Sequence, residues 1–122
     1  MTHWLLEDPK QFEGKNIVVG KYKLEEYIGH GTIGVVYRAV REEIGDIVAC
    51  KLIPRGNLKE GWETELEKIS KLDGIEQVVS YRTHGAEIIN GEPFVYILWQ
   101  FIKGQDLRDI IKAGSSIITI SF

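Results

Sequence analysis

The chain has 122 residues, and its 15 Lys and Arg against 18 Asp and Glu give a formal charge of −3, which disfavours a nucleic-acid-binding protein. This length suits one domain with a hydrophobic core, and 43% hydrophobic with 27% charged residues exclude a disordered or fibrous chain. Glycine is over-represented, at 13 residues, so the positions of the glycines carry information.

Cys50 is the sole cysteine of the sequence, so no disulfide can form within the chain and a reducing compartment is the simpler expectation. It is best interpreted as a core thiol, because the scattered His3, His30 and His84 lack the close spacing of zinc ligands. The first residues do not resemble a secretory signal, and no apolar run is long enough to span a membrane. We therefore expect a cytoplasmic protein without a membrane span.

Residues 1–19 mix apolar and charged side chains, and we interpret them as a leader that packs weakly onto the rest of the chain. Residues 22–28 and 35–40 are rich in β-branched and aromatic residues and predict two strands around a glycine-rich loop at 29–34. After a turn at Gly45-Asp46, residues 47–53 predict a third strand that Pro54 ends.

Residues 59–72 carry apolar side chains at helical spacing, and Asp73-Gly74 would close this helix. Two more strands are predicted at 78–84 and 94–101, with a hairpin turn signal at Asn90-Gly91 between strand-like runs. The fold class is therefore α+β, with five antiparallel strands and one main helix. A short helix is predicted over 105–112, and the apolar tail 117–122 fits either a strand or the first turn of a buried helix.

The glycine string 29–34 has the spacing G-x-G-x-x-G, which occurs in several nucleotide-binding loops. A strand-like run follows Gly34, whereas a dinucleotide-binding fold would begin a helix there, and no Lys-Ser/Thr pair follows as in a Walker A loop. The remaining candidate is a β-hairpin whose glycine tip lets backbone N–H groups approach phosphates. A flexible hairpin without a ligand is the alternative.

Residues 29–37, followed by Val48-Ala49-Cys50-Lys51, resemble the glycine-rich loop and the strand-three lysine of protein kinases. Residues 19–22 and 27–29 are similar to the start of eukaryotic-like, Hanks-type serine/threonine kinases. The resemblance covers about residues 20 to 112. It implies a leader at 1–19, a kinase small lobe and hinge at 20–104, and the start of the large lobe at 105–122, where the tail would begin a long helix.

Strand alternation places Ala49 and Lys51 on one face and Cys50 on the other. The resemblance implies that Lys51 binds the α- and β-phosphates of ATP and that a glutamate of the following helix holds it. Among the helix glutamates, Glu65 lies beside the apolar face and has the family spacing, while Glu63 and Glu67 point away. A solvated surface position is the alternative for Glu65.

The resemblance also implies an adenine site. Backbone groups of Gln100 and Ile102 would bind the base, and Asp106 would lie near the ribose unless it only caps a helix. Trp99 falls at the gatekeeper position, where its indole would fill the back pocket. The remaining implied contacts with ATP come from the roof of the site and from its loop: Ile28, Val36, Ala49, Gly29, His30, Gly31, Thr32, Ile33 and Gly34.

The 122 residues contain no H-R-D-x-x-x-x-N, D-F-G or A-P-E motif. We therefore expect the N-terminal part of an ATP- and Mg²⁺-dependent kinase that phosphorylates Ser or Thr of protein substrates, with the magnesium ligands elsewhere and the chain alone inactive. Two alternatives stay open. One is a pseudokinase-like interaction module, and the other is a small-molecule kinase of the same fold.

Overall fold

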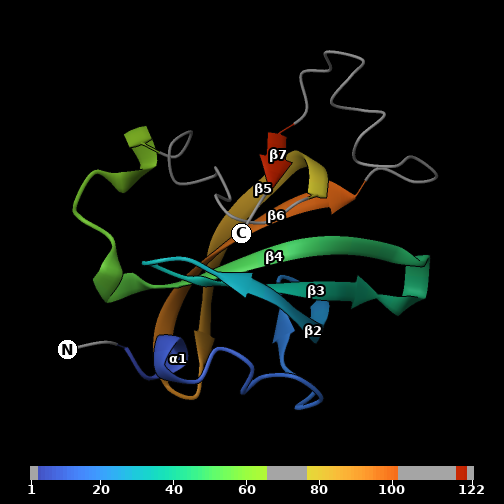
Figure 1. Cartoon of the computed structure of the whole chain (residues 1–122), viewed down its shortest axis with the longest axis horizontal. Coiled ribbons are helices and arrows are strands. Elements are labelled where there is room, and N and C mark those ends of the chain that lie inside the picture. Colours follow the sequence, from blue (N-terminus) through green and yellow to red (C-terminus); the bar gives the residue numbers. More distant parts are fainter. Residues whose placement is uncertain (1–2, 66–76, 102–117, 121–122) are drawn as a thin grey trace.

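The computed structural model of the chain describes residues 3–65, 77–101 and 118–120 (Figure 1). In this part of the chain, all strands join one antiparallel sheet in the order β1-β2-β3-β4-β6-β5-β7. The elements are, in chain order, α1 (Trp4–Glu7), β1 (Val18–Val19), β2 (Tyr22–His30), β3 (Val35–Arg41), η1 (Glu42–Ile44), β4 (Asp46–Pro54), η2 (Arg55–Asn57), η3 (Trp62–Glu65), β5 (Gln77–Ile89), β6 (Glu92–Phe101) and β7 (Ile118–Ile120), where η marks a 3₁₀ helix.

The five predicted strands are confirmed as β2 to β6, and the short β1 and β7 extend the sheet at its two edges. The predicted turns are also present. Asn90 and Gly91 have φ values of 52° and 79°, the left-handed pair that a tight hairpin turn needs, and Gly45 has a φ of 63°.

The apolar tail forms β7, which pairs with Gln77–Val79 of β5. Of the two alternatives for this segment, the strand is therefore confirmed, and the expectation that a helix begins there is wrong at residues 118–120. The predicted helix 59–72 is described only at its beginning, as η3. Residues 66–72, the closure at Asp73-Gly74 and the helix at 105–112 lie outside the described residues.

The side chains of β4 alternate between two faces of the sheet, and both faces are covered. Every residue from Val48 to Pro54 is buried. On one face Cys50 belongs to the leader-side cluster, which comprises Leu5, Phe12, Val19, Tyr22, Leu24, Val35, Tyr37, Ala39, Val48, Cys50, Leu52, Ile89, Phe94 and Leu98. On the other face Ala49 belongs to the loop-side cluster, which comprises Val36, Ala49, Ile53, Leu58, Trp62, Val95, Ile97 and Trp99.

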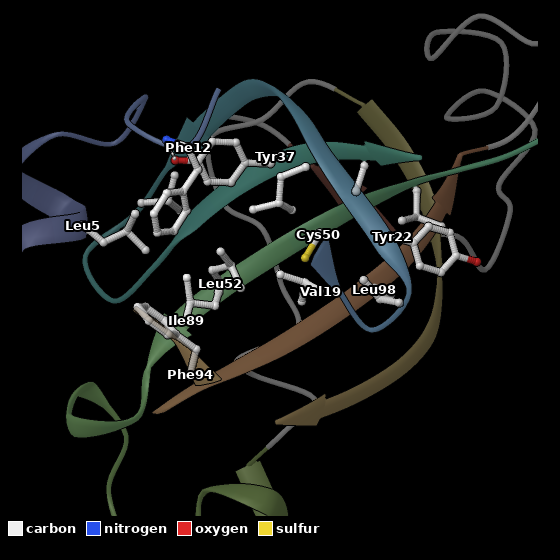
Figure 2. Packing of buried hydrophobic residues seen from close by; sticks show 14 residues of the cluster. Leu5, Phe12, Val19, Tyr22, Tyr37, Cys50, Leu52, Ile89, Phe94 and Leu98 are labelled. Atoms are coloured by element: carbon white, nitrogen blue, oxygen red, sulfur yellow. Dashed lines mark hydrogen bonds between the residues drawn. The ribbon is translucent and has the colours of Figure 1, made fainter. Parts of the chain in front are cut away.

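The expectation that the leader packs weakly is wrong. Leu5, Phe12 and Val19 are 0%, 3% and 0% exposed and lie inside the leader-side cluster. Figure 2 shows Leu5 and Phe12 at one end of this cluster, Tyr22 at the other, and Cys50 between them. The physical reason is that the apolar face of a sheet must be covered, and no other described element covers this one.

Polar contacts fix the leader at both ends of its path. Trp4 Nε1 donates to Glu92 Oε1 at 2.8 Å, and His3 Nε2 lies 2.7 Å from Glu92 Oε2, so α1 sits beside the β5–β6 turn (Figure 1). Farther along, the Tyr37 hydroxyl donates to the Pro9 carbonyl and accepts from Phe12 N–H at 3.4 Å. Burial raises the pKa of Tyr37, so the hydroxyl keeps its proton for this bond.

The sheet curls so that its β1–β2 turn approaches β5. A Cβ atom on Gly20 or on Gly85 would lie only 2.9 Å or 2.5 Å from the Tyr96 side chain, so the phenol ring is wedged between the two glycines. Beside it, Arg82 of β5 donates to Asp46 and to the Tyr22 hydroxyl. The curl encloses the leader-side cluster.

Candidate functional site

The glycine-rich loop connects β2 to β3 as a tight hairpin. Gly31 N–H donates to the Gly34 carbonyl at 3.0 Å, and both Gly31 and Thr32 are exposed at the tip. A Cβ on Gly31 would meet no atom within 4 Å, so the tip presents backbone with open space around it. Such a tip can let N–H groups reach an anion without interference from side chains.

Gly34 and Gly29 stand closer to the sheet than the tip does. A Cβ on Gly34 would lie 2.5 Å from the Leu52 carbonyl oxygen of β4, so only glycine lets the loop descend this close to the strand. Gly29 is buried and pairs with Val36 across the hairpin. His30 ends β2, and its Nδ1 lies 2.6 Å from the Tyr27 hydroxyl.

The loop adjoins the loop-side cluster of buried apolar residues. Val36 and Ala49 are 1% and 0% exposed, and the partly buried Ile28 and Ile33 pack against the same cluster. Three residues predicted to surround an adenine ring, Ile28, Val36 and Ala49, are thus brought together on one face. Their apolar side chains are of the kind that lines the binding sites of flat aromatic ligands, and in this structure Val36 and Ala49 are covered by the rest of the cluster.

Lys51 lies on the same face, as the strand alternation predicted. It pairs with Val36 of β3 and with Ile97 of β6, and antiparallel partners share a face. Its side chain is 7% exposed, and it is the sole buried charged residue among those that the structure describes. Lys51 places a cationic side chain on the face that adjoins the glycine-rich loop, and this face is therefore a candidate anion site.

The other predicted contacts are described less fully. Glu65 is the last residue of η3, so its backbone position is described, but its side chain lies outside the described part of the structure. Gln100 is exposed near the end of β6 and pairs with Val48. Ile102 and Asp106 lie outside the described residues, so their predicted contacts stay predictions.

Trp99 is fully buried beside the candidate site. It is 0% exposed and pairs with Ala49 on β4. Its indole Nε1 has no hydrogen-bond partner in the described part of the chain. The indole therefore occupies space on the face where the roof residues and Lys51 gather.

Sequence reasoning missed two residues that hold the loop and the strand leading to it. Asn57 Nδ2 donates to the Ile33 carbonyl at 3.0 Å, and Glu13 Oε2 accepts from Tyr27 N–H at 2.8 Å. Neither Asn57 nor Glu13 lies in a recognisable motif. The apolar character of the leader was the one available signal, because Leu5 and Phe12 are unusual for a segment that stays in solvent.

Comparison with known protein families adds a decisive finding to this geometry. The protein kinase domain family matches residues 22–121 of the chain. The chain belongs to the protein kinase domain family. The fold expected from the resemblance, a kinase small lobe built on an antiparallel sheet, is thereby confirmed.

Individual relatives agree with this assignment. The chain is 31% identical over 101 residues to CBL-interacting serine/threonine-protein kinase 18 of Arabidopsis thaliana, covering 81% of the chain and 19% of that protein. It is 37% identical over 97 residues to serine/threonine-protein kinase prk-2 of Caenorhabditis elegans, covering 69% and 22%. A probable serine/threonine-protein kinase PknB of Bifidobacterium longum is 28% identical over 109 residues, covering 80% and 16%. The chain thus spans about a fifth of the length of these kinases.

The described part of the chain contains neither a membrane-spanning helix nor a metal-binding group of side chains. Within residues 3–65, 77–101 and 118–120, no helix has the length and apolar character required to cross a membrane. In the same described part, no group of three or more His, Cys, Asp and Glu side chains is placed to hold a metal ion.

Proposed function

We propose that this chain is the ATP-binding small lobe of a protein kinase that transfers the γ-phosphate of ATP to Ser or Thr hydroxyls of protein substrates. The observation that carries the proposal is the position of Lys51, a buried ammonium on the same face as Ala49 and Val36 and next to the glycine-rich hairpin. The named relatives, which are serine/threonine kinases, support it.

The residues present fit the two parts of ATP. The apolar side chains of Ile28, Val36 and Ala49 suit contact with an adenine ring, and the open tip at Gly31 suits the phosphates. Lys51 would hold the α- and β-phosphates and fix their geometry, which matters because phosphoryl transfer depends on positioning and charge neutralisation. Magnesium, bound to the phosphates, would neutralise further charge, and its protein ligands belong to a lobe beyond these residues.

The 122-residue chain by itself lacks motifs that phosphoryl transfer requires. The catalytic-loop and D-F-G motifs that supply a base and magnesium ligands do not occur in the 122 residues. The floor of the adenine site would come from the large lobe. We therefore propose that the isolated chain binds ATP weakly and transfers no phosphate.

Titration of Mg-ATP against the 122-residue chain, followed by NMR amide shifts, tests this proposal. We expect weak, saturable shifts at residues 29–34 and at Ala49, and we expect Lys51→Met to abolish them while the remaining spectrum stays folded. Lys15→Met, which removes one exposed charge from the leader, is the matched control and should bind like the wild type. Sub-micromolar affinity, phosphate transfer by the isolated chain, or unchanged binding by Lys51→Met would contradict the proposal.

A non-catalytic interaction module is the second candidate, and Trp99 is the observation that favours it. Its buried indole pairs with Ala49 and occupies space on the adenine face. The coding sequence downstream of Phe122 separates the two candidates. An in-frame catalytic loop and metal-binding Asp would favour the enzyme, and their absence would favour the module.

A further inference from the structure

Among the residues that the structure describes, backbone pairing along the outer edge of β2 is confined to its beginning. β1 pairs with Tyr22 and Lys23, and Leu24 N–H donates to the Ile17 carbonyl at 2.8 Å. Farther along β2, toward the glycine-rich loop, a side chain of the leader replaces the neighbouring strand. Glu13 Oε2 accepts a hydrogen bond of 2.8 Å from Tyr27 N–H.

This contact falls at an irregular part of the hairpin. The register between β2 and β3 shifts between Leu24 and Glu26 and again between Tyr27 and Gly29. Tyr27 therefore stands between two interruptions of the ladder, where a strand bends and its local direction is weakly fixed by pairing. A hydrogen bond to a carboxylate at this position is a strong local restraint, since charged acceptors bind N–H groups more tightly than neutral ones.

The side chain of Tyr27 extends the restraint in both directions. Its hydroxyl lies 2.6 Å from His30 Nδ1 at the start of the loop, and its ring packs edge-on against Tyr37 with a centroid distance of 6.4 Å. On the leader side, Lys10 Nζ lies 5.6 Å from the centroid of the Tyr27 ring. The Tyr37 hydroxyl is bonded to Pro9, so the whole arrangement rests on residues 9–13.

We propose that residues 9–13 of the leader brace the glycine-rich loop from outside, and that Glu13 is the positioning residue of this brace. The opposite side of the loop is held by Asn57 through the Ile33 carbonyl. With both sides held, the glycine-rich loop keeps its distance from the sheet face that bears Lys51. The consequence for nucleotide affinity rests on the proposed function, whereas the brace itself does not.

The test compares Glu13→Ala, Glu13→Gln and Glu7→Ala in the 122-residue chain. Amide hydrogen exchange measured without nucleotide should become about fivefold faster at residues 27–34 in Glu13→Ala, as expected for the loss of one hydrogen bond. Exchange at core residues such as Leu52 should stay unchanged. Glu13→Gln keeps an acceptor oxygen but loses its charge, so it should bring the exchange rates back toward the wild-type rates, and the exposed Glu7 of α1 is the matched control.

The Kd of Mg-ATP, measured by the same NMR titration, should rise severalfold in Glu13→Ala and return toward the wild-type value in Glu13→Gln. Unchanged exchange at residues 27–34, a uniform rise in exchange over the whole chain, or exchange in Glu13→Gln as fast as in Glu13→Ala would overturn the brace. Faster exchange at residues 27–34 together with an unchanged Kd of Mg-ATP would show that the brace does not affect the nucleotide site. If wild-type chain binds no Mg-ATP, the proposed function fails, and the exchange measurement still decides whether the brace exists.

Discussion

Gly34 shows how one residue can serve the loop and the sheet together. A Cβ at this position would lie 2.5 Å from a backbone oxygen of Leu52, which cannot move without displacing β4. We expect Gly34→Ala to lower the free energy of unfolding by about 2 kcal/mol, as overpacking of a tight contact does. Urea denaturation measures this change.

Gly31→Ala is the matched control, because a Cβ there meets no atom within 4 Å. Its effect on the free energy of unfolding should stay within about 0.5 kcal/mol, as at other unconstrained surface positions. Equal destabilisation by both substitutions would show that the contact with Leu52 does not limit Gly34.

The Cys50 thiol is shielded from reagents in solution. The thiol is 0% exposed in the leader-side cluster, and burial raises its pKa above the ordinary range. Since the thiolate is the reactive form, we expect a thiol reagent such as Ellman's reagent to label the native chain only as fast as the chain opens. Labelling should become fast and complete in denaturing urea, and rapid labelling of the native chain would contradict the buried position.

The leader behaves as a structural element of the lobe. Leu5 is fully buried, so Leu5→Ala should lower the free energy of unfolding by about 2–4 kcal/mol, the cost of a cavity in a core. Leu6, its half-buried neighbour in α1, provides the comparison, and Leu6→Ala should cost clearly less. Urea denaturation of the two variants checks the order, and a reversed order would contradict the packing of α1 against the sheet.

Strands and leader differ in how well the sequence predicts them. β2 to β6 carry β-branched and aromatic residues between turn signals, so local preference and tertiary structure agree. In the leader, Leu5, Phe12 and Val19 stand seven residues apart, a spacing that would fit a helix, whereas the structure has only the short α1 and the strand β1 there. Their burial depends on the concave face of a sheet whose strands come later in the chain, and no local pattern contains that information.

At the scale of the whole molecule, buried acidic groups link stability to pH, and the Tyr37 hydroxyl and the Cys50 thiol have the largest rises in pKa among the described residues. Burial raises the pKa of both Tyr37 and Cys50, so the folded chain holds these protons more tightly than the unfolded chain. Their contribution to stability is complete below the unfolded pKa values, about 8.5 for Cys and 10 for Tyr, and is lost as pH rises above them. The urea concentration at the midpoint of unfolding should therefore decrease as the pH is raised from about 8 to about 11. Tyr37→Phe should weaken this dependence, and an identical fall in that variant would exclude Tyr37 as its source.

The candidate site is partly predictable from sequence, for a physical reason. Val36, Ala49 and Lys51 share a face because side chains alternate along strands, and this needs only the correct strand boundaries. The contacts of Asn57 and Glu13 with the loop and its strand depend on how distant segments meet across the whole lobe. Such contacts carry no spacing signal and become visible only in three dimensions.

The buried position of Lys51 also bears on how the lobe folds. β4 is covered on both faces, so a slip of one residue against β3 and β6 would exchange the faces and move the ammonium into the cluster around Cys50. Lys51 is 7% exposed in the observed register, and the slip would surround it with the still more deeply buried side chains of that cluster, where burying a charge costs more free energy. We therefore expect Lys51 to favour the observed strand register over the slipped one, with or without nucleotide.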